Sequence, residues 1–312
     1  MKSPVFFLLR IYVACYSGGV FAMDEAAIIE GRKTFFIVPD SALLPEEYLQ
    51  DFLIRGYETY IINDDRYCPI QQKVEILINT FPDSILFFFI DTQIPDLDWS
   101  DFIRSLQQKY NGKVLLGVLY VKRNDDRQKA MLEKYYLFDM GIQCGCIALE
   151  YQKNKNFALI DRVMHANQAE GRRKNVRAIC DNNSRINFSV NKMGLVQGEI
   201  LDVSMSHFSC VLESGLNIKI YEKLKRMLVN INGMHFTTDA ILVMTRELQD
   251  KTLYIFVFTR SDGQQGLESD IELRLAEKLY QMITGKVKEL LRSKFEEAGK
   301  TLRNKYSRAY TA

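Results

Sequence analysis

The sequence predicts a multi-domain α/β plus all-β chain: a doubly wound five-stranded sheet, then a six-stranded β-barrel, then an α-helical tail. Three observations support this expectation. Strand-like and helix-like apolar runs alternate between residues 34 and 150. Six short strand-like runs with turn residues between them follow, between residues 185 and 259. Apolar residues then recur mostly at three- or four-residue steps from Leu267 to Leu302, which is the spacing of one face of an α-helix.

The first region alternates strand and helix, as a doubly wound sheet with helical crossovers requires. Its most informative run is Ser84–Ile90, in which six of seven residues are apolar without alternation. A strand of that composition is buried on both faces, as in the centre of a parallel sheet. The expected strands cover residues 34–38, 57–62, 84–90, 113–121 and 143–150. One expected helix begins at Pro45, and three others cover residues 70–81, 99–110 and 125–138. A further helix, 154–167, leads out of the sheet.

The second region carries strand signals without helical periodicity. Six short strands separated by turn residues favour a small closed barrel, whose core the apolar runs 228–231 and 253–258 supply. The expected strands cover residues 185–190, 196–203, 208–213, 225–232, 238–245 and 251–259.

The tail, residues 266–304, reads as an amphipathic helix that Gly285 is expected to bend or divide. Three uses of its apolar stripe are open: packing against the barrel, a helix-mediated dimer or partner surface, and membrane binding. Acidic residues interrupt the basic face, which disfavours stable membrane insertion.

Composition limits the function classes. The chain has 312 residues with 47% hydrophobic and 26% charged residues, as in soluble globular proteins. A net charge of +2 argues against a dedicated nucleic-acid binder. No nucleophile–histidine–acid arrangement can be argued from the three histidines, and there is no glycine-rich phosphate loop, which argues against an enzyme. The six cysteines contain no C-x-x-C pair, so reduced thiols are expected, with no metal and no cofactor.

The N-terminal 22 residues leave two interpretations open. Lys2 precedes an apolar run, as in a signal peptide, and Cys15 could belong to a lipoprotein signal. Arg10 interrupts that run, and a start at Met23 would make the segment an upstream extension. We expect a cytoplasmic protein, with export as the alternative.

A cationic cluster is the strongest functional signal. Gly171–Arg177 holds four cations in seven residues, and Asp202 and Ser204 follow 25 and 27 residues beyond Arg177. Such a cluster is typical of an anion site. Arginine grips phosphate at two points and stacks on bases, so a ligand with both groups is expected. The alternatives are a solvated linker at the cluster and an ordinary turn at Asp202 and Ser204.

These two motifs resemble the PilZ family, which binds cyclic di-GMP. Its marks are R-x-x-x-R before the barrel, here Arg173 and Arg177 with Arg172 beside them, and [D/N]-x-S-x-x-G, here Asp202 and Ser204. The resemblance implies that the arginines contact phosphate and guanine, and that Asp202 and Ser204 contact the guanine edge. His207 stands where the family has glycine, and it is counted among the candidate ligand-binding residues because its imidazole could stack on a base. A strained positive φ there would weaken binding about tenfold.

Residues 23–150 resemble the receiver domain of bacterial response regulators. Asp91 follows the central strand where receivers carry the phospho-acceptor, and Pro95 comes at the family's spacing. The rest of the acid site departs from the pattern: Pro39-Asp40 replaces a pair of acids, residues 119–121 include no serine or threonine, and strand five has no matching lysine. The resemblance therefore implies a pseudo-receiver used for contact or dimerisation, with Asp91 as a vestigial phospho-acceptor.

Taken together, the sequence predicts a non-enzymatic cyclic di-GMP effector that couples ligand binding at an interdomain hinge to a protein partner in motility or signalling. The partner would bind the receiver-like domain or the C-terminal helix, and the chain could form a homodimer. The alternative is a degenerate PilZ adaptor that binds no nucleotide. The expected domains are an extension (1–22), the receiver-like domain (23–150), a connecting helix (151–170), the PilZ-like barrel (171–262) and the helical tail (263–312).

Overall fold

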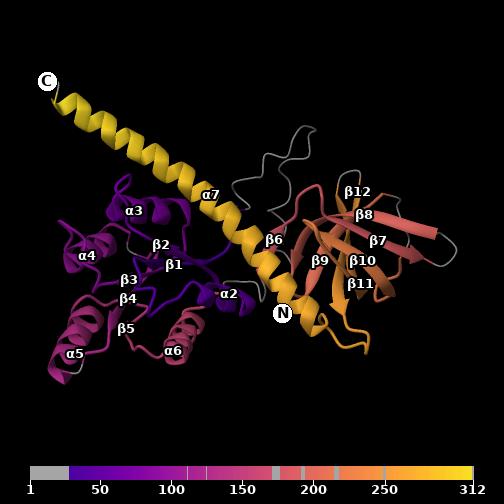
Figure 1. Cartoon of the computed structure of the whole chain (residues 1–312), viewed down its shortest axis with the longest axis horizontal. Coiled ribbons are helices and arrows are strands. Elements are labelled where there is room, and N and C mark those ends of the chain that lie inside the picture. Colours follow the sequence, from indigo (N-terminus) through magenta and orange to yellow (C-terminus); the bar gives the residue numbers. More distant parts are fainter. Residues whose placement is uncertain are drawn as a thin grey trace, which may run out of the picture. The chain divides into compact units, whose positions relative to one another are not determined.

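A computed structural model describes residues 28–310, except 111, 124, 171–175, 191–193, 214–217 and 249–250, and leaves out the side chains of 153, 248 and 302–310. It contains a parallel sheet with surrounding helices, an antiparallel barrel and a long helix (Figure 1). This architecture confirms the predicted fold class. Residues from Gly31 onward form one contact unit.

The first sheet has the strand order β2-β1-β3-β4-β5, and every neighbouring pair is parallel. The order reverses between β1 and β3, as in doubly wound sheets of the flavodoxin type. Its strands are β1 (Lys33–Ile37), β2 (Glu58–Ile62), β3 (Ile85–Phe89), β4 (Leu115–Val121) and β5 (Cys146–Leu149). The helices are α2 (Glu47–Ile54), α3 (Ile70–Thr80), α4 (Trp99–Lys109), α5 (Asp126–Glu133) and α6 (Lys153–Ala166).

The central strand β3 is buried along its whole length, as its composition predicts. Phe87 stacks on Phe36 of β1, with ring centroids 5.5 Å apart, in the core that includes α2 and α6. Phe88 faces the opposite layer and contacts Trp99 of α4. Burial of aromatic residues on both faces stabilises this strand as the middle of the sheet.

One predicted helix changes its geometry part-way. Asp125 accepts the backbone N–H of Arg127 and so caps α5. After Glu133 the chain continues as the π-helix η1 (Lys134–Asp139) rather than as α-helix. The single α-helix expected over residues 125–138 is therefore wrong in its second half.

The barrel has six antiparallel strands in the order β8-β7-β10-β11-β12-β9, and pairing of β9 with β8 closes it. A further short strand, β6, pairs with the other edge of β8 near its end and was not expected. The strands are β6 (Arg177–Ile179), β7 (Arg185–Val190), β8 (Gly194–Ser204), β9 (His207–Leu212), β10 (Lys223–Ile231), β11 (Met234–Leu248) and β12 (Lys251–Thr259).

The tail is one helix, α7 (Ser269–Tyr310). Leu275 and Leu279 are buried in the same hydrophobic cluster as the barrel core, which confirms packing against the barrel. Farther along, α7 contacts α2 and α3. Gly285 does not divide the helix, contrary to expectation. The neighbouring Ile283 and Val287 are buried, and such packing outweighs the roughly 1 kcal/mol helix penalty of glycine.

The thiols in the described part of the chain are all free. Over the same residues, no cluster of acids, histidines and cysteines could hold a metal ion. None of the described helices is long and apolar enough to cross a membrane.

Candidate ligand site at the start of the barrel

The short strand β6 brings the two sequence motifs together. It pairs antiparallel with the end of β8, so that Arg177 lies opposite Ser204 and Ile179 lies opposite Asp202. Residues 25 positions apart in the sequence thus become neighbours on adjacent strands. A three-residue strand has few ladder hydrogen bonds of its own, so its position depends on the pairing with β8 and on contacts from elsewhere.

Arg177 and Asp202 form an ion pair across these strands. Arg177 Nη1 lies 3.5 Å from Asp202 Oδ1, and the two side chains are 37% and 15% exposed. The other carboxylate oxygen of Asp202 accepts a hydrogen bond of 2.5 Å from Ser209 Oγ on β9. Asp202 is therefore held firmly, whereas the guanidinium is half-exposed and loosely paired. A pair of this kind contributes at most about 1 kcal/mol, so an anionic ligand can compete for the arginine.

Ser204 is engaged within the protein. Its hydroxyl oxygen accepts the backbone N–H of His207 at 3.1 Å and also lies 3.2 Å from the carbonyl oxygen of His207, to which it donates. The side chain is buried, with 2% of its surface exposed. Ser204 thus closes the turn between β8 and β9, which is the turn role that the sequence left open.

His207 does not have the strained backbone that the sequence predicted. It is not among the residues with positive φ, because it begins strand β9 and pairs with Val257 of β12. Its imidazole Nδ1 lies 2.6 Å from Ser206 Oγ. Burial, and secondly the charge of Arg177, lower the pKa of His207, while Asp202 opposes the shift. The imidazole therefore stays neutral beside the Arg177–Asp202 pair.

The site is only partly visible in the structure. Arg172 and Arg173, like the rest of Gly171–Asn175, lie outside the described residues. Arg177, Asp202, Ser204 and His207 are described, and the pairing of β6 with β8 and the turn into β9 bring them close together.

Two further residues belong to this site and were not predicted. Ser209 lies opposite Asp202 in the β8–β9 register and orients its carboxylate. Lys286 of α7 donates from Nζ to the carbonyl oxygen of Ile179 in β6, at 2.6 Å. The alternation of side chains along a strand could have suggested Ser209, since its position opposite Asp202 depends only on the register of β8 and β9. No sequence signal places Lys286, because that contact spans 107 positions.

The predicted phospho-acceptor, Asp91, lies just beyond the carboxyl end of β3. Its carboxylate accepts the backbone N–H of Val121 at 2.6 Å and forms an ion pair with Arg123. Asp40, which follows β1, uses its carboxylate to accept the N–H of Ala42 in a local turn. The carboxylate of Asp91 is therefore compensated by an arginine of the chain itself.

Comparison with known proteins finds similarity in structure only. No family model matches the sequence, and no curated protein matches it. The PilZ domain of YcgR from Escherichia coli, solved with c-di-GMP, is 14% identical, with a TM-score of 0.33, over 38% of this chain and 97% of that one. Full YcgR in complex with c-di-GMP is 16% identical, with a TM-score of 0.31, over 41% of this chain and 51% of that one. The K. pneumonia MrkH–c-di-GMP complex is 14% identical, with a TM-score of 0.33, over 38% of this chain and 54% of that one. The match thus spans about half the length of YcgR and MrkH.

Proposed function

We propose that this chain is a non-enzymatic effector that binds cyclic di-GMP where β6 meets β8. The observation that supports it is the pairing of β6 with β8, which sets Arg177 opposite Ser204 and 3.5 Å from Asp202. An exposed guanidinium beside a fixed carboxylate suits a ligand that carries both phosphates and guanines.

The chemistry of each group fits such a ligand. Arg177 can donate to a phosphate or to the O6/N7 edge of guanine. Asp202, oriented by Ser209, can accept from guanine N–H groups. Arg172 and Arg173 precede Arg177 by only five and four positions, so they can reach the same ligand.

The output would be a protein contact. We propose that the α/β sheet acts as a pseudo-receiver, because Arg123 occupies the carboxylate of Asp91, and that this sheet or α7 meets the partner, including a second copy of the chain. Ligand binding at the interdomain hinge would change how the barrel presents the partner surface, in a motility or signalling pathway.

Titration of the purified full chain with cyclic di-GMP, followed by isothermal calorimetry, tests this function. We expect saturable binding below about 50 µM, which corresponds to roughly 6 kcal/mol. Arg177→Ala should weaken binding at least about tenfold, because a hydrogen bond to a charged group contributes roughly 1.5–3 kcal/mol.

Arg185→Ala is the matched control. Arg185 forms a similar cross-strand pair with Glu199, 3.7 Å apart, on β7 and β8, and its loss should leave the affinity unchanged. If cyclic di-GMP does not bind by about 50 µM, the proposed function is wrong. If both variants weaken binding equally, the site is wrong.

A second candidate, an adaptor that binds no nucleotide, is favoured by the internal partners of Ser204 and by the imidazole beside Arg177. His207→Gly separates the two candidates. Since His207 has no positive φ, any gain in affinity would come from removing the imidazole rather than from relieved strain. New or stronger binding supports a nucleotide site that His207 obstructs, and continued absence of binding in both proteins supports the adaptor.

A further inference from the structure

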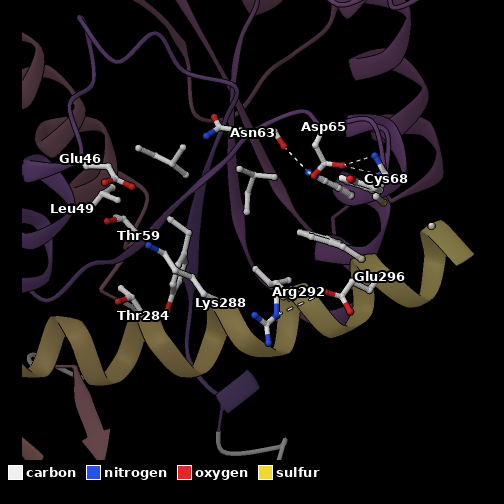
Figure 2. Close-up of a pocket in the computed structure, with 18 of the residues that line it drawn as sticks. Glu46, Leu49, Thr59, Asn63, Asp65, Cys68, Thr284, Lys288, Arg292 and Glu296 are labelled. Atoms are coloured by element: carbon white, nitrogen blue, oxygen red, sulfur yellow. Dashed lines mark hydrogen bonds and ion pairs between the residues drawn. The ribbon is translucent and has the colours of Figure 1, made fainter.

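A cavity of about 700 Å³ lies between the edge strand β2 and helix α7 (Figure 2). Its walls are formed by residues 59–63 on one side, by the loop around Asp65 and Cys68 at one end, and by the α7 segment from Tyr280 to Lys300 on the other side. None of the residues of the β6–β8 site lines it. The cavity is therefore a separate feature that the proposed function does not use.

The cavity follows the open edge of the parallel sheet. Strand β2 is the terminal strand and pairs only with β1 in the described part of the chain. Five consecutive residues, Thr59–Asn63, line the cavity, so side chains from both faces of the strand border it. Thr59 is 3% exposed, and its hydroxyl has no hydrogen-bond partner among the residues described. The hydroxyl oxygen itself is buried, so Thr59 borders the cavity without offering it an accessible polar atom.

The floor and the rim of the cavity differ in character. Buried apolar side chains form the floor, among them Leu49, Tyr60, Ile62 and Leu291. The rim on α7 carries three exposed cations on one helix face: Lys288, Arg292 one turn farther, and Lys300 two turns beyond that. Glu296 lies on the same face between the last two.

The rim cations are largely uncompensated. Lys288 and Lys300 form no ion pair with any described residue, and Arg292 has only a 3.9 Å pair with Glu296. On the opposite wall Asp65 is already paired with Lys73, so the other acids of the lining are Glu46 and the exposed Glu296. Lys288 extends from α7 toward β2 in Figure 2. The mouth of the cavity therefore favours a negative group, and its interior favours hydrocarbon.

We propose that this cavity binds an amphipathic organic anion, with an aliphatic chain on the apolar floor and a carboxylate at Lys288 and Arg292. The volume lies within the range of about 300–1,000 Å³ typical of small-molecule sites. Burial of the ligand's aliphatic chain provides affinity, and the rim cations favour a ligand with an anionic head group over one with a neutral head group. This site shares no residue with the proposed cyclic di-GMP site, so the two proposals fail or succeed separately.

The test is calorimetric titration of the full chain, without cyclic di-GMP, with dodecanoate and with dodecan-1-ol. We expect saturable binding of one dodecanoate per chain, and weaker binding of the alcohol by roughly three- to tenfold, because the rim pairs are partly exposed. Lys288→Met should reduce dodecanoate affinity to a similar extent and remove most of the preference for the carboxylate. Thr59→Val, which preserves side-chain shape and removes only a buried hydroxyl, should leave dodecanoate binding unchanged.

Lys113→Met is the control, since Lys113 is an exposed lysine of the same sheet region that does not line the cavity. Its affinity for dodecanoate should equal that of the unmodified chain. The proposal is overturned if dodecanoate does not bind by about 100 µM. It is equally overturned if Lys288→Met binds dodecanoate as well as the Lys113→Met control does.

Discussion

At the scale of single residues, His207 shows how a side chain can depart from a family pattern without distorting the backbone. The sequence suggested a strained conformation at the family's glycine position, yet the residue starts strand β9 with ordinary φ. The difference lies in the side chain: a half-buried imidazole lies beside Arg177 and Asp202. Relative to glycine, His207 therefore adds a half-buried, uncharged ring beside this pair.

The lowered pKa of His207 predicts a dependence of stability on acid. Burial, followed by the charge of Arg177, holds this pKa below the ordinary value of 6.5. The unfolded chain then binds a proton at a higher pH than the folded chain does, so protonation favours unfolding. We expect the free energy of unfolding to fall as pH decreases from above 6.5 through the folded pKa, and His207→Gln to reduce that fall. Urea denaturation between pH 7.5 and 5 measures it, at about half-unit steps.

His235→Gln is the control for this prediction, because His235 is an exposed histidine on β11 of the same barrel. The control should keep the pH dependence of the unmodified protein. A His207→Gln protein with an unchanged dependence would show that His207 does not contribute to acid sensitivity.

At the scale of elements, α7 contains two glycines whose surroundings differ completely. A Cβ added at Gly299 would lie 2.5 Å from the backbone oxygen of Tyr67, whereas one added at Gly285 would meet nothing within 4 Å. Gly299 thus permits the close approach of α7 to the loop beyond β2, and Gly285 has no such role.

The two glycines give opposite predictions for the same substitution. Gly285→Ala should stabilise the protein by about 0.5–1 kcal/mol, because alanine favours the helix over glycine. Gly299→Ala should destabilise it by roughly 1–3 kcal/mol, because the overlap with Tyr67 outweighs the same helical gain. Urea denaturation of both variants measures the difference, and equal stabilisation by both would show that the contact between α7 and Tyr67 is not formed.

Most elements were predictable because their apolar residues recur at a regular spacing or form a continuous run. The strands 185–190 and 251–259 agree with β7 and β12 in both bounds, and the apolar run around β3 identified the centre of the sheet. Strand β6 was missed because three residues carry no periodicity and its pairing depends on β8. The π-helical turn was missed because a widened helix has nearly the same apolar spacing as an α-helix.

The site was predictable only in part, for a related reason. Motif residues such as Asp202 can be identified from their neighbours in the sequence. The hydrogen bond from Ser209 depends on strand register, and the one from Lys286 depends on where a helix more than 100 positions away lies. The cavity beside β2 could not be predicted either, because it arises from the approach of α7 to a sheet edge.

At the scale of the whole molecule, α7 connects the candidate sites. Its Leu275 and Leu279 pack with the barrel core, Lys286 holds β6, and the segment beyond Tyr280 forms one wall of the cavity. Because a helix is stiff over such a length, we expect a displacement at one of these contacts to shift the others. Of these contacts, the hydrogen bond from Lys286 to β6 lies nearest to the β6–β8 site.

Lys286→Met tests whether α7 fixes β6. Methionine keeps the aliphatic stem of the half-buried lysine but removes the 2.6 Å hydrogen bond to the Ile179 carbonyl. Loss of that bond leaves β6 held mainly by its short pairing with β8, so local opening should become more frequent. We expect amide hydrogen exchange at Arg177–Ile179 to accelerate about 5- to 30-fold, which corresponds to roughly 1–2 kcal/mol. As exchange accelerates, the affinity for cyclic di-GMP should fall, because the proposed ligand contact requires Arg177 to be held in position.

Lys278→Met is the matched control, because Lys278 is a partly buried lysine two turns earlier in α7 that forms no ion pair or hydrogen bond with a described residue. Exchange at β6 should be unchanged in that variant. If Lys286→Met also leaves exchange at β6 unchanged, the strand is held by β8 alone and α7 does not connect the sites. If exchange accelerates while dodecanoate binding stays constant, the helix remains docked over β2, and the effect belongs to the Lys286 contact rather than to a general loosening of α7.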